Sequence, residues 1–204
     1  MLKSCNSHII PGHLEVFCGP MYSGKTQSLL ARLDPLKHMN ADFLFLKPDC
    51  DSRKSRAYGA ECLYVDENSP SLIFDFVKPS HELIAIDEIQ FFAKGISGVI
   101  EELLRSGKNV VAAGLDLNFR GEPFGCMPYV LPIANEIIKL KSAVCRYPSE
   151  NGGICRKIAT RTQRIINGMP ADYNAPVISI EGEDARERYE PRCLEHHFVP
   201  NRPK

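Results

Sequence analysis

The sequence predicts an α/β protein, with a parallel sheet that carries helices on both faces and a smaller domain at the C-terminal end. Uninterrupted apolar runs at Leu83–Ile86 and Val110–Ala113 are typical of strands that are covered on both faces. Beyond Lys141 such runs stop, and cysteines occur among polar and glycine-rich segments. We therefore expect two domains, at residues 1–141 and 142–204.

The N-terminal part alternates strand patterns with helix patterns, which is the order of elements in α/β folds. Its first strand is expected at Leu14–Cys18, and a glycine-bearing loop leads from it into a helical pattern at Thr26–Leu33. We expect Pro35 to end or kink this helix, because proline lacks the N–H that a helix interior needs. The remaining expected elements are a strand at Phe43–Leu46, helices at Leu72–Val77 and Ile96–Arg105, and a last helix over much of Tyr129–Leu140.

The composition is that of an ordinary globular protein without a dominant charge. Hydrophobic residues make up 44% of the 204 residues, and 25 basic residues balance 25 acidic ones. A chain without net charge has no overall field that attracts nucleic acid or an anionic membrane surface. We therefore expect neither of these as a partner.

The N-terminal residues lack the apolar core of a signal peptide. No apolar run approaches the roughly 20 residues that are needed to cross a bilayer. These features predict a cytoplasmic protein. Cysteines stay reduced in the cytoplasm, so the eight cysteines are interpreted as free thiols or metal ligands.

The loop after the first strand has the spacing of a phosphate-binding loop, Gly-x-x-x-x-Gly-Lys-Thr. In this pattern backbone N–H groups surround the phosphates, the lysine reaches the terminal phosphates, and the hydroxyl is a ligand of Mg²⁺. A plain glycine turn is the alternative, but the strand before the loop and the helix after it favour a nucleoside triphosphate site. The residues assigned to the loop are Gly19, Pro20, Met21, Tyr22, Ser23, Gly24, Lys25 and Thr26.

Two acids end the expected strand Leu83–Ile86. In proteins with a phosphate loop this is the place of the aspartate that orients Mg²⁺, a role that fits Asp87. The next carboxylate, Glu88, can accept a proton from an attacking hydroxyl or water if it lies within hydrogen-bond reach. The alternative is that both acids solvate a strand end, and the phosphate loop upstream argues against it.

A cluster of cysteine and histidine in the C-terminal part has the composition of a zinc site. Cys193 and His196 have the spacing of a metal knuckle, and Cys145 and Cys155 lie upstream. Four protein ligands would make Zn²⁺ structural, in a region with too few apolar residues for a core of its own. His197 is an alternative ligand. The remaining cysteines, which show no such pairing and are interpreted as buried or incidental thiols, are Cys5, Cys18, Cys50, Cys62 and Cys126.

Together these residues resemble the cellular-type, zinc-containing thymidine kinase family, and the resemblance covers nearly the whole chain. It rests on five motifs in the same order. They are the phosphate loop Gly19–Thr26, Lys47-Pro48-x-x-Asp51-x-Arg53, Ile86-Asp87-Glu88-x-Gln90-Phe91-Phe92, Gly114-Leu115-Asp116 through Phe119 to Pro123-Phe124, and Tyr189-Glu190-x-Arg192-Cys193.

The resemblance implies a RecA-like phosphate-loop sheet and assigns roles to individual residues. It makes Glu88 the general base that takes the proton of the nucleoside 5′-hydroxyl, in agreement with the assignment from position alone. It places Asp51, Arg53 and Gln90 with Asp87 around the phosphates and the metal. It implies that Phe91, Leu115 and Phe119 line a base pocket and that Tyr189 helps to enclose the nucleoside.

The resemblance also implies a lasso loop, based on the zinc module, that closes over the nucleoside with backbone hydrogen bonds. The residues that it places in this loop are Val177, Ile178, Ser179, Ile180 and Glu181. The chain departs from the family pattern at Ile89, Asn118 and Tyr58, and in the long interval between Cys145 and Cys155. Cys155 is therefore the least certain of the four ligands.

The function expected from the resemblance is the ATP-dependent phosphorylation of thymidine, and of deoxyuridine, with Mg²⁺ on the phosphates. It also implies a homotetramer and feedback inhibition by dTTP. A kinase for another deoxynucleoside is one alternative. A nucleotide switch whose zinc ribbon binds nucleic acid is a second, and the zero net charge and the many acids of the C-terminal part argue against it.

Overall fold

The computed structural model describes residues 12–51, 62–149, 152–178 and 186–203, and these form two compact units. The first unit contains the described residues of Met1–Phe17, Thr26–Gly114 and Gly125–Ile138. The second unit contains Cys18–Lys25, Leu115–Phe124 and the described residues of Lys139–Lys204. The chain therefore crosses between the units several times, in addition to the single boundary expected near Lys141.

A six-stranded, mostly parallel sheet with the strand order β3-β2-β4-β5-β1-β6 forms the frame of the first unit. The central pairs β2/β4 and β4/β5 are parallel, as is the outer pair β2/β3. The strands are β1 (Leu14–Cys18), β2 (Phe43–Pro48), β3 (Cys62–Val65), β4 (Leu83–Ile86), β5 (Asn109–Gly114) and β6 (Glu136–Lys139). Every residue of β1, β4 and β5 is buried, which confirms the expectation from their apolar runs.

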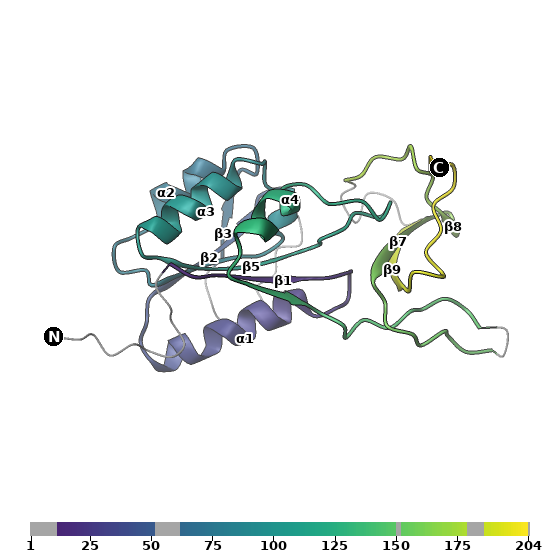
Figure 1. Ribbon diagram of the computed structural model, residues 1–204, viewed down its shortest axis with the longest axis horizontal. Coiled ribbons are helices and arrows are strands. Elements are labelled where there is room, and N and C mark those ends of the chain that lie inside the picture. Colours follow the sequence, from purple (N-terminus) through teal and green to yellow (C-terminus); the bar gives the residue numbers. More distant parts are fainter. Residues whose placement is uncertain (1–11, 52–61, 150–151, 179–185, 204) are drawn as a thin grey trace. The chain divides into compact units, whose positions relative to one another are not determined.

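Helices cover both faces of this sheet, as expected, with α1 on one face and α2, α3 and α4 on the other (Figure 1). The α-helices are α1 (Lys25–His38), α2 (Ile73–Phe76), α3 (Ile96–Arg105) and α4 (Met127–Val130), and the 3-10 helices are η1 (Pro70–Leu72), η2 (Ile89–Phe91) and η3 (Leu131–Ile133). Helix α3 has the expected bounds, and its buried side chains lie at the spacing of one helical face: Ile96, Val99, Ile100 and Leu103. The structure thus confirms the α/β class.

Two expected helix ends or spans are wrong. Helix α1 does not end at Pro35 but continues to His38, because the fully buried Leu33 and Leu36 on either side of the proline keep this helix packed. The segment Tyr129–Leu140 is not a long helix. Pro132 removes an N–H that a continuing helix needs, and the chain instead joins the sheet edge, where the N–H of Asn135 donates to the carbonyl of Leu14.

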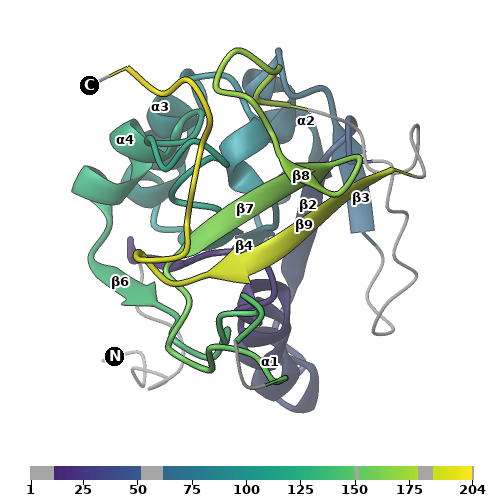
Figure 2. The ribbon, with the colours of Figure 1, turned by 90° about the vertical axis from the view of Figure 1, so that its right-hand side faces the viewer.

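The second unit contains a three-stranded antiparallel sheet in the order β8-β7-β9 (Figure 2). Its strands are β7 (Arg161–Ile166), β8 (Met169–Pro170) and β9 (Glu187–Arg192). Phe119, Ala171 and Val199 form a small apolar cluster. Polar side chains are buried in this unit as well: Thr162, Gln163, Arg164 and Arg192.

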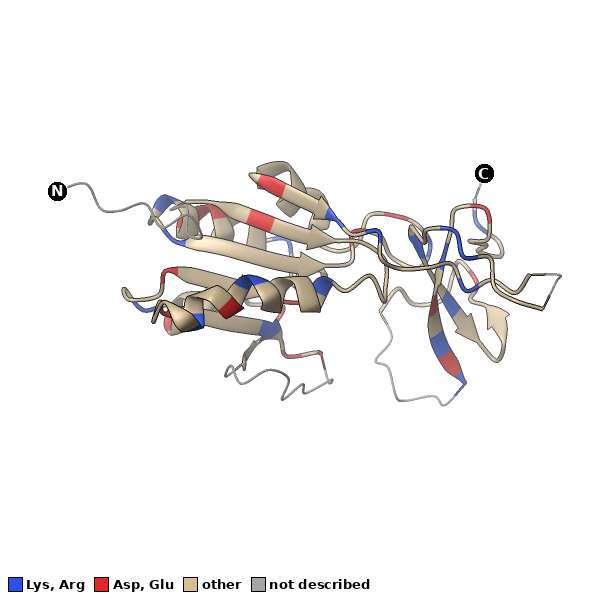
Figure 3. Ribbon diagram, turned by 90° about the horizontal axis from the view of Figure 1, so that it is seen from below, with Lys and Arg blue, Asp and Glu red and all other residues tan. Residues whose placement is uncertain are grey.

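Charged residues of both signs are distributed along the elements of each unit. Helix α1 and strand β9 both carry acidic and basic side chains (Figure 3). Within the described part of the chain, each helix is too short or too polar to span a bilayer.

Candidate functional site

The phosphate loop contains two glycines with positive φ angles. Gly19 and Gly24 have φ angles of 143° and 84°, in the region where a side chain is strained. A Cβ atom on Gly19 would lie 3.0 Å from Ser23 Oγ and 3.2 Å from the carbonyl oxygen of Leu140. The loop therefore needs glycine at position 19 for its conformation and for its packing.

Polar contacts hold the loop in the second unit. The Lys25 ammonium donates to the carbonyl of Pro20 at 2.9 Å, and the N–H of Met21 donates to Thr162 Oγ1 at 3.0 Å. Ser23 Oγ is buried, and it has no hydrogen-bond partner within the described ranges. A hydroxyl in this state, next to a buried lysine, fits the polar phosphate group of a bound nucleotide.

Three charged side chains and one hydroxyl form a buried cluster at the carboxyl ends of β2 and β4 in the first unit. The Lys47 ammonium lies 3.0 Å from Asp87 Oδ2 and 3.4 Å from Asp51 Oδ2. The hydroxyl of Thr26, the last residue of the phosphate-loop motif, donates to the Asp87 carboxylate at 3.0 Å. The sequence motifs assigned Thr26, Asp51 and Asp87 to the phosphates and the metal. In the structure these three residues belong to one cluster.

The electrostatics of this cluster are set by burial and by mutual charge. Burial raises the pKa of Asp87, and the neighbouring Glu88 carboxylate raises it further, whereas Lys47 and Thr26 act in the opposite direction. Burial acts to lower the pKa of Lys47, but the carboxylates of Asp87 and Asp51 outweigh it and raise this pKa. The Thr26 hydroxyl and the two aspartates are hard oxygen donors, the type of ligand that Mg²⁺ prefers.

The sequence analysis assigned no role to Lys47, although a charged residue within an apolar strand could have indicated one. It interrupts the apolar strand β2, and its side chain is only 6% exposed. A charged residue at a buried strand position indicates an ion pair or a functional site.

Glu88 lies two residues after the end of β4 and has a left-handed backbone, with φ 53° and ψ 37°. A non-glycine residue in this conformation is strained, and such strain is concentrated at functional sites. The buried Gln90 amide donates to Glu88 Oε2 at 2.6 Å. Two glycines pack tightly against Gln90, since a Cβ on Gly114 would lie 2.6 Å from its Oε1 and one on Gly125 would lie 1.9 Å from its backbone oxygen. Gln90 is thus held in place, and it orients Glu88.

The predicted pocket residues lie in different environments. Phe91 is half-buried in η2, and Leu115 is half-buried just after β5. Phe119 is 3% exposed and belongs to the apolar cluster of the second unit. Tyr189 is half-buried on β9, where it pairs in register with Arg164 of β7.

The remaining predicted residues lie at the end of a described range or outside the described residues. Val177 is half-buried and Ile178 is exposed, at the end of a described range. Arg53 and the lasso residues Ser179, Ile180 and Glu181 lie outside the described residues, as do Cys5 and Tyr58.

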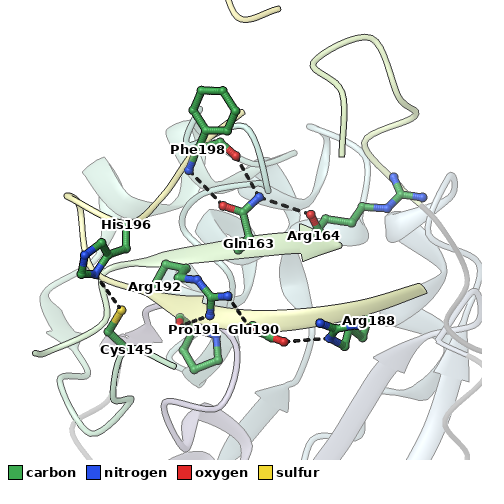
Figure 4. Close-up of polar contacts among 9 residues, drawn as sticks. All are labelled: Cys145, Gln163, Arg164, Arg188, Glu190, Pro191, Arg192, His196 and Phe198. Atoms are coloured by element: carbon green, nitrogen blue, oxygen red, sulfur yellow. Dashed lines mark hydrogen bonds and ion pairs between the residues drawn. The ribbon is translucent and has the colours of Figure 1, made fainter. Parts of the chain in front are cut away.

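The four predicted zinc ligands come together in the second unit. The ligand atoms of Cys145, Cys155, Cys193 and His196 all lie within 4.8 Å of one another. His196 Nδ1 lies 3.4 Å from Cys193 Sγ and 3.7 Å from Cys145 Sγ (Figure 4 shows the latter contact). Three sulfurs and one imidazole nitrogen are a donor set that fits a closed tetrahedral Zn²⁺ site.

The long interval between Cys145 and Cys155 folds back on itself, which explains how the least certain ligand reaches the cluster. An antiparallel bridge joins Pro148 to Ile154, and the N–H of Cys155 donates to the carbonyl of Tyr147. The Tyr147 ring also stacks on His196, with the ring centroids 4.2 Å apart and the planes 10° from parallel. His197, the alternative ligand, lies elsewhere: its Nε2 is 2.8 Å from the carbonyl oxygen of Phe119.

Cys193 differs from the other described thiols, whereas burial raises the pKa of its cluster neighbour Cys145. At Cys193 burial acts to raise the pKa, but N–H groups of the following residues and the neighbouring thiols outweigh it and lower this pKa. Burial raises the pKa of Cys18 to about 11 and that of Cys126 to about 12. Burial also raises the pKa of Cys50 to about 12 and that of Cys62 to about 11. These four remain protonated thiols at neutral pH, which agrees with their interpretation as buried or incidental.

Comparison with known proteins identifies the family. A family profile described as thymidine kinase matches residues 12–197. The thymidine kinase of Coprothermobacter proteolyticus is 41% identical over 94% of this chain and 93% of its own length. The thymidine kinase of Mycoplasmoides gallisepticum is 40% identical over 94% of this chain and 84% of its own, and that of Onion yellows phytoplasma is 38% identical over 92% and 88%. With its phosphate loop, its carboxylate cluster and its Cys/His cluster in the order of the family motifs, the chain belongs to the thymidine kinase family.

Proposed function

We propose that this protein is an ATP-dependent kinase that transfers the γ-phosphate of ATP to the 5′-hydroxyl of thymidine, and also of deoxyuridine. One observation carries the proposal: relatives named thymidine kinase match more than nine-tenths of the chain at 38% to 41% identity. The buried acid and lysine groups at the strand ends support it, because they are the groups that phosphoryl transfer requires.

The donor is bound by the phosphate loop. Its backbone N–H groups and the Lys25 ammonium neutralise the phosphates, and the carbonyl of Pro20 keeps the ammonium within the loop. Thr26 and Asp87 would hold Mg²⁺, with Asp51 near them, and such an ion would supply positive charge to the transferred phosphate. Lys47 keeps both aspartates in place by ion pairing.

The acceptor is activated by Glu88. Its carboxylate takes the proton of the 5′-hydroxyl as the oxygen attacks the γ-phosphate, so that the alkoxide does not have to form free in water. Gln90 donates a hydrogen bond to Oε2 and so orients the carboxylate that is proposed to accept the proton. The residues that we propose to surround the nucleoside are Phe91, Leu115, Phe119, Tyr189 and the loop Val177–Glu181.

The zinc site is proposed to be structural. Cys145, Cys155, Cys193 and His196 would fill the four positions of a tetrahedral Zn²⁺, which leaves none for a substrate. If Zn²⁺ binds there, these residues would join the segment directly after β9 to the hairpin between Cys145 and Cys155. Three finer proposals come from the family resemblance alone: a homotetramer, feedback inhibition by dTTP and a cytoplasmic location.

Replacement of the proposed base tests the mechanism. Glu88→Gln is expected to lower kcat by at least about a hundredfold, the usual loss for a general base, while binding of an ATP analogue stays nearly unchanged. Glu101→Gln makes the same chemical change on the exposed face of α3, where Glu101 pairs with Arg105, and is expected to leave kcat unchanged. Near-normal turnover in Glu88→Gln would place the base elsewhere.

The choice of acceptor is tested by a product assay over the four deoxynucleosides. Formation of dTMP is expected, and phosphorylation of deoxycytidine without thymidine would reject the proposed substrate. Salt-dependent DNA binding without any nucleoside phosphorylation would favour a nucleic-acid-binding ATPase instead.

A further inference from the structure

We infer that Arg164 is a positioning residue for the nucleoside half of the proposed reaction. Its guanidinium contacts the ring of Phe119, the carbonyl oxygen of Pro176 and Glu187, the first residue of β9. The inference rests on the proposed function, in which Phe119 and Tyr189 belong to the acceptor site. It concerns side chains of the second unit alone.

The contacts of Arg164 reach three separate segments of the chain. Nη1 donates to the carbonyl oxygen of Pro176, and Nη2 donates to Glu187 Oε2 at 2.9 Å. The guanidinium carbon also lies 5.5 Å from the centroid of the Phe119 ring. A planar guanidinium can donate in two directions and cover a ring at the same time, whereas the ammonium of lysine is a point charge. The arrangement therefore requires arginine specifically.

Burial makes these contacts strong and makes their loss costly. The Arg164 side chain is only 5% exposed, and its partner Glu187 is 12% exposed. Hydrogen bonds between ionised groups that are removed from water are stronger than neutral ones, and loss of one partner leaves a buried charge behind. Pro176 and Glu187 are therefore held in one place by one side chain.

A second arginine completes the arrangement on the Phe119 ring. The guanidinium carbon of Arg120 lies 5.6 Å from the Phe119 centroid and 4.6 Å from the Tyr173 centroid. Arg120 Nη2 donates to the carbonyl of Ala175 at 2.9 Å, so Arg120 and Arg164 bind two consecutive carbonyls of one segment. The guanidinium groups of Arg120 and Arg164 thus both lie over the Phe119 ring, and both are held by the segment Ala175-Pro176.

The orientation of Arg164 connects it with the predicted acceptor site and separates it from the zinc cluster. Arg164 and Tyr189 are directly opposite in the β7/β9 register, so their side chains leave the same face of the sheet. Figure 4 shows the Arg164 side chain extending away from Gln163 and away from the pair Cys145 and His196. A change at Arg164 is thus expected to disturb Phe119 and Tyr189 and to leave metal binding intact.

Arg164 and Arg120 are also not arranged for stability alone. The Nε–H groups of both side chains are buried and have no acceptor within residues 12–51, 62–149, 152–178 and 186–203. An unsatisfied buried donor destabilises the fold and calls for an explanation other than packing. A role in orienting Phe119 is such an explanation, because both guanidinium groups lie over the ring while they donate to the carbonyls of Ala175 and Pro176.

The test compares variants of the full, zinc-loaded chain in steady-state kinetics. Arg164→Met is expected to raise KM for thymidine by about 10- to 100-fold, the range for loss of charge-assisted hydrogen bonds, with KM for ATP within about twofold of the parent. Arg164→Lys is expected to recover only part of this loss. Arg188→Met is the matched control, because Arg188 lies on β9, is 57% exposed and pairs with Glu190.

Readouts other than activity separate positioning from a general loss of fold. Zinc content is expected to stay at one ion per chain in Arg164→Met, and hydrogen exchange of the amides in Tyr173–Ile178 is expected to become faster without any nucleoside present. If Arg164→Met does not fold, Arg164→Lys and Glu187→Gln carry the test, since each removes part of the same set of contacts.

The outcomes also distinguish this inference from the proposed function. Unchanged KM for thymidine in Arg164→Met and Arg164→Lys would overturn the inference, as would an equal rise in both KM values or full recovery by lysine. A parent protein that does not phosphorylate thymidine would overturn the proposed function. In that case unchanged hydrogen exchange at Tyr173–Ile178 would overturn the structural part of the inference independently.

Discussion

The two units are stabilised by different kinds of contact. In the first unit β4 and β5 are buried at every position, and α3 covers them with a row of apolar side chains. In the second unit a small apolar cluster lies beside buried polar side chains, among them Gln163, Arg164 and Arg192. The first unit therefore depends on packing. The second depends on specific hydrogen bonds, ion pairs and, as we propose, a metal ion.

The two units also differ in whether their clusters of polar and ionisable side chains contain a cation from the chain. Lys47 pairs with both Asp51 and Asp87, so the chain itself supplies a cation to this cluster. The Cys/His cluster brings three thiols together without a cation from the chain among its members. Removal of a ligand should consequently affect the second unit more than the first.

Removal of zinc is expected to have the largest effect and to show the contrast most directly. Structural zinc sites contribute on the order of 10 kcal/mol of folding free energy, which a small apolar cluster cannot replace. Chelation, or Cys193→Ser, is expected to accelerate hydrogen exchange strongly in β7 and β9 and to leave β4 and β5 protected. Exchange measured by mass spectrometry gives this pattern. A metal-free preparation with full thymidine kinase activity would contradict the structural role of the metal.

A cavity in the first unit is expected to have the next largest effect. Leu33 of α1 is fully buried, and Leu33→Ala is expected to reduce the free energy of unfolding by about 2–5 kcal/mol through lost apolar burial and the cavity that remains. Denaturant titration measures the change. Leu72→Ala removes the same atoms at a position that is 42% exposed and should change stability by less than about 0.5 kcal/mol. Equal effects of the two variants would show that the sheet is not held by packing.

Loss of a buried polar contact in the second unit is expected to have the smallest effect of the three. Gln163 accepts from the N–H of Phe198 at 3.0 Å and donates to its carbonyl at 2.9 Å (Figure 4). Gln163→Leu leaves both backbone groups without these partners and is expected to destabilise by about 1–3 kcal/mol in spite of the added apolar surface. The exposed Gln27→Leu serves as a control. A stabilised Gln163→Leu would show that the second unit is also held mainly by apolar burial.

The sequence predicted the elements of the first unit better than those of the second, for a physical reason. The strands Leu14–Cys18 and Leu83–Ile86 and the helix Ile96–Arg105 appear with the expected bounds, because their apolar patterns reflect burial directly. Strands β7 and β9 were not expected. Their buried faces carry Gln163, Arg164 and Arg192, and a polar residue signals burial only when its partners are known.

The edge strand β6 could also not be predicted from the local sequence pattern. The sequence at Glu136–Lys139 was expected to be helical, and it forms the edge strand β6 because the neighbouring strand offers backbone partners. The same applies to Pro35, whose unfavourable helix propensity is outweighed by packing of the leucines around it.

The sequence by itself determined the chemistry that depends on neighbours along the chain. The loop Gly19–Thr26 and the pair Asp87 and Glu88 could be proposed as site residues because each motif is short. Binding of phosphates or transfer of a proton would restrict the residue types in such motifs. Four metal-ligating residues could also be named, although their order along the chain left one of them uncertain.

Only the tertiary structure decided which distant residues meet. It brought Lys47 to Asp87, returned Cys155 to Cys145 through a hairpin, and placed Arg164 against three separate segments. These contacts join residues far apart in the chain, where hydrogen bonds and ion pairs depend on distances of a few ångströms that no local pattern encodes. The local motifs thus named the candidate reacting groups, and the fold determines which residues contact them.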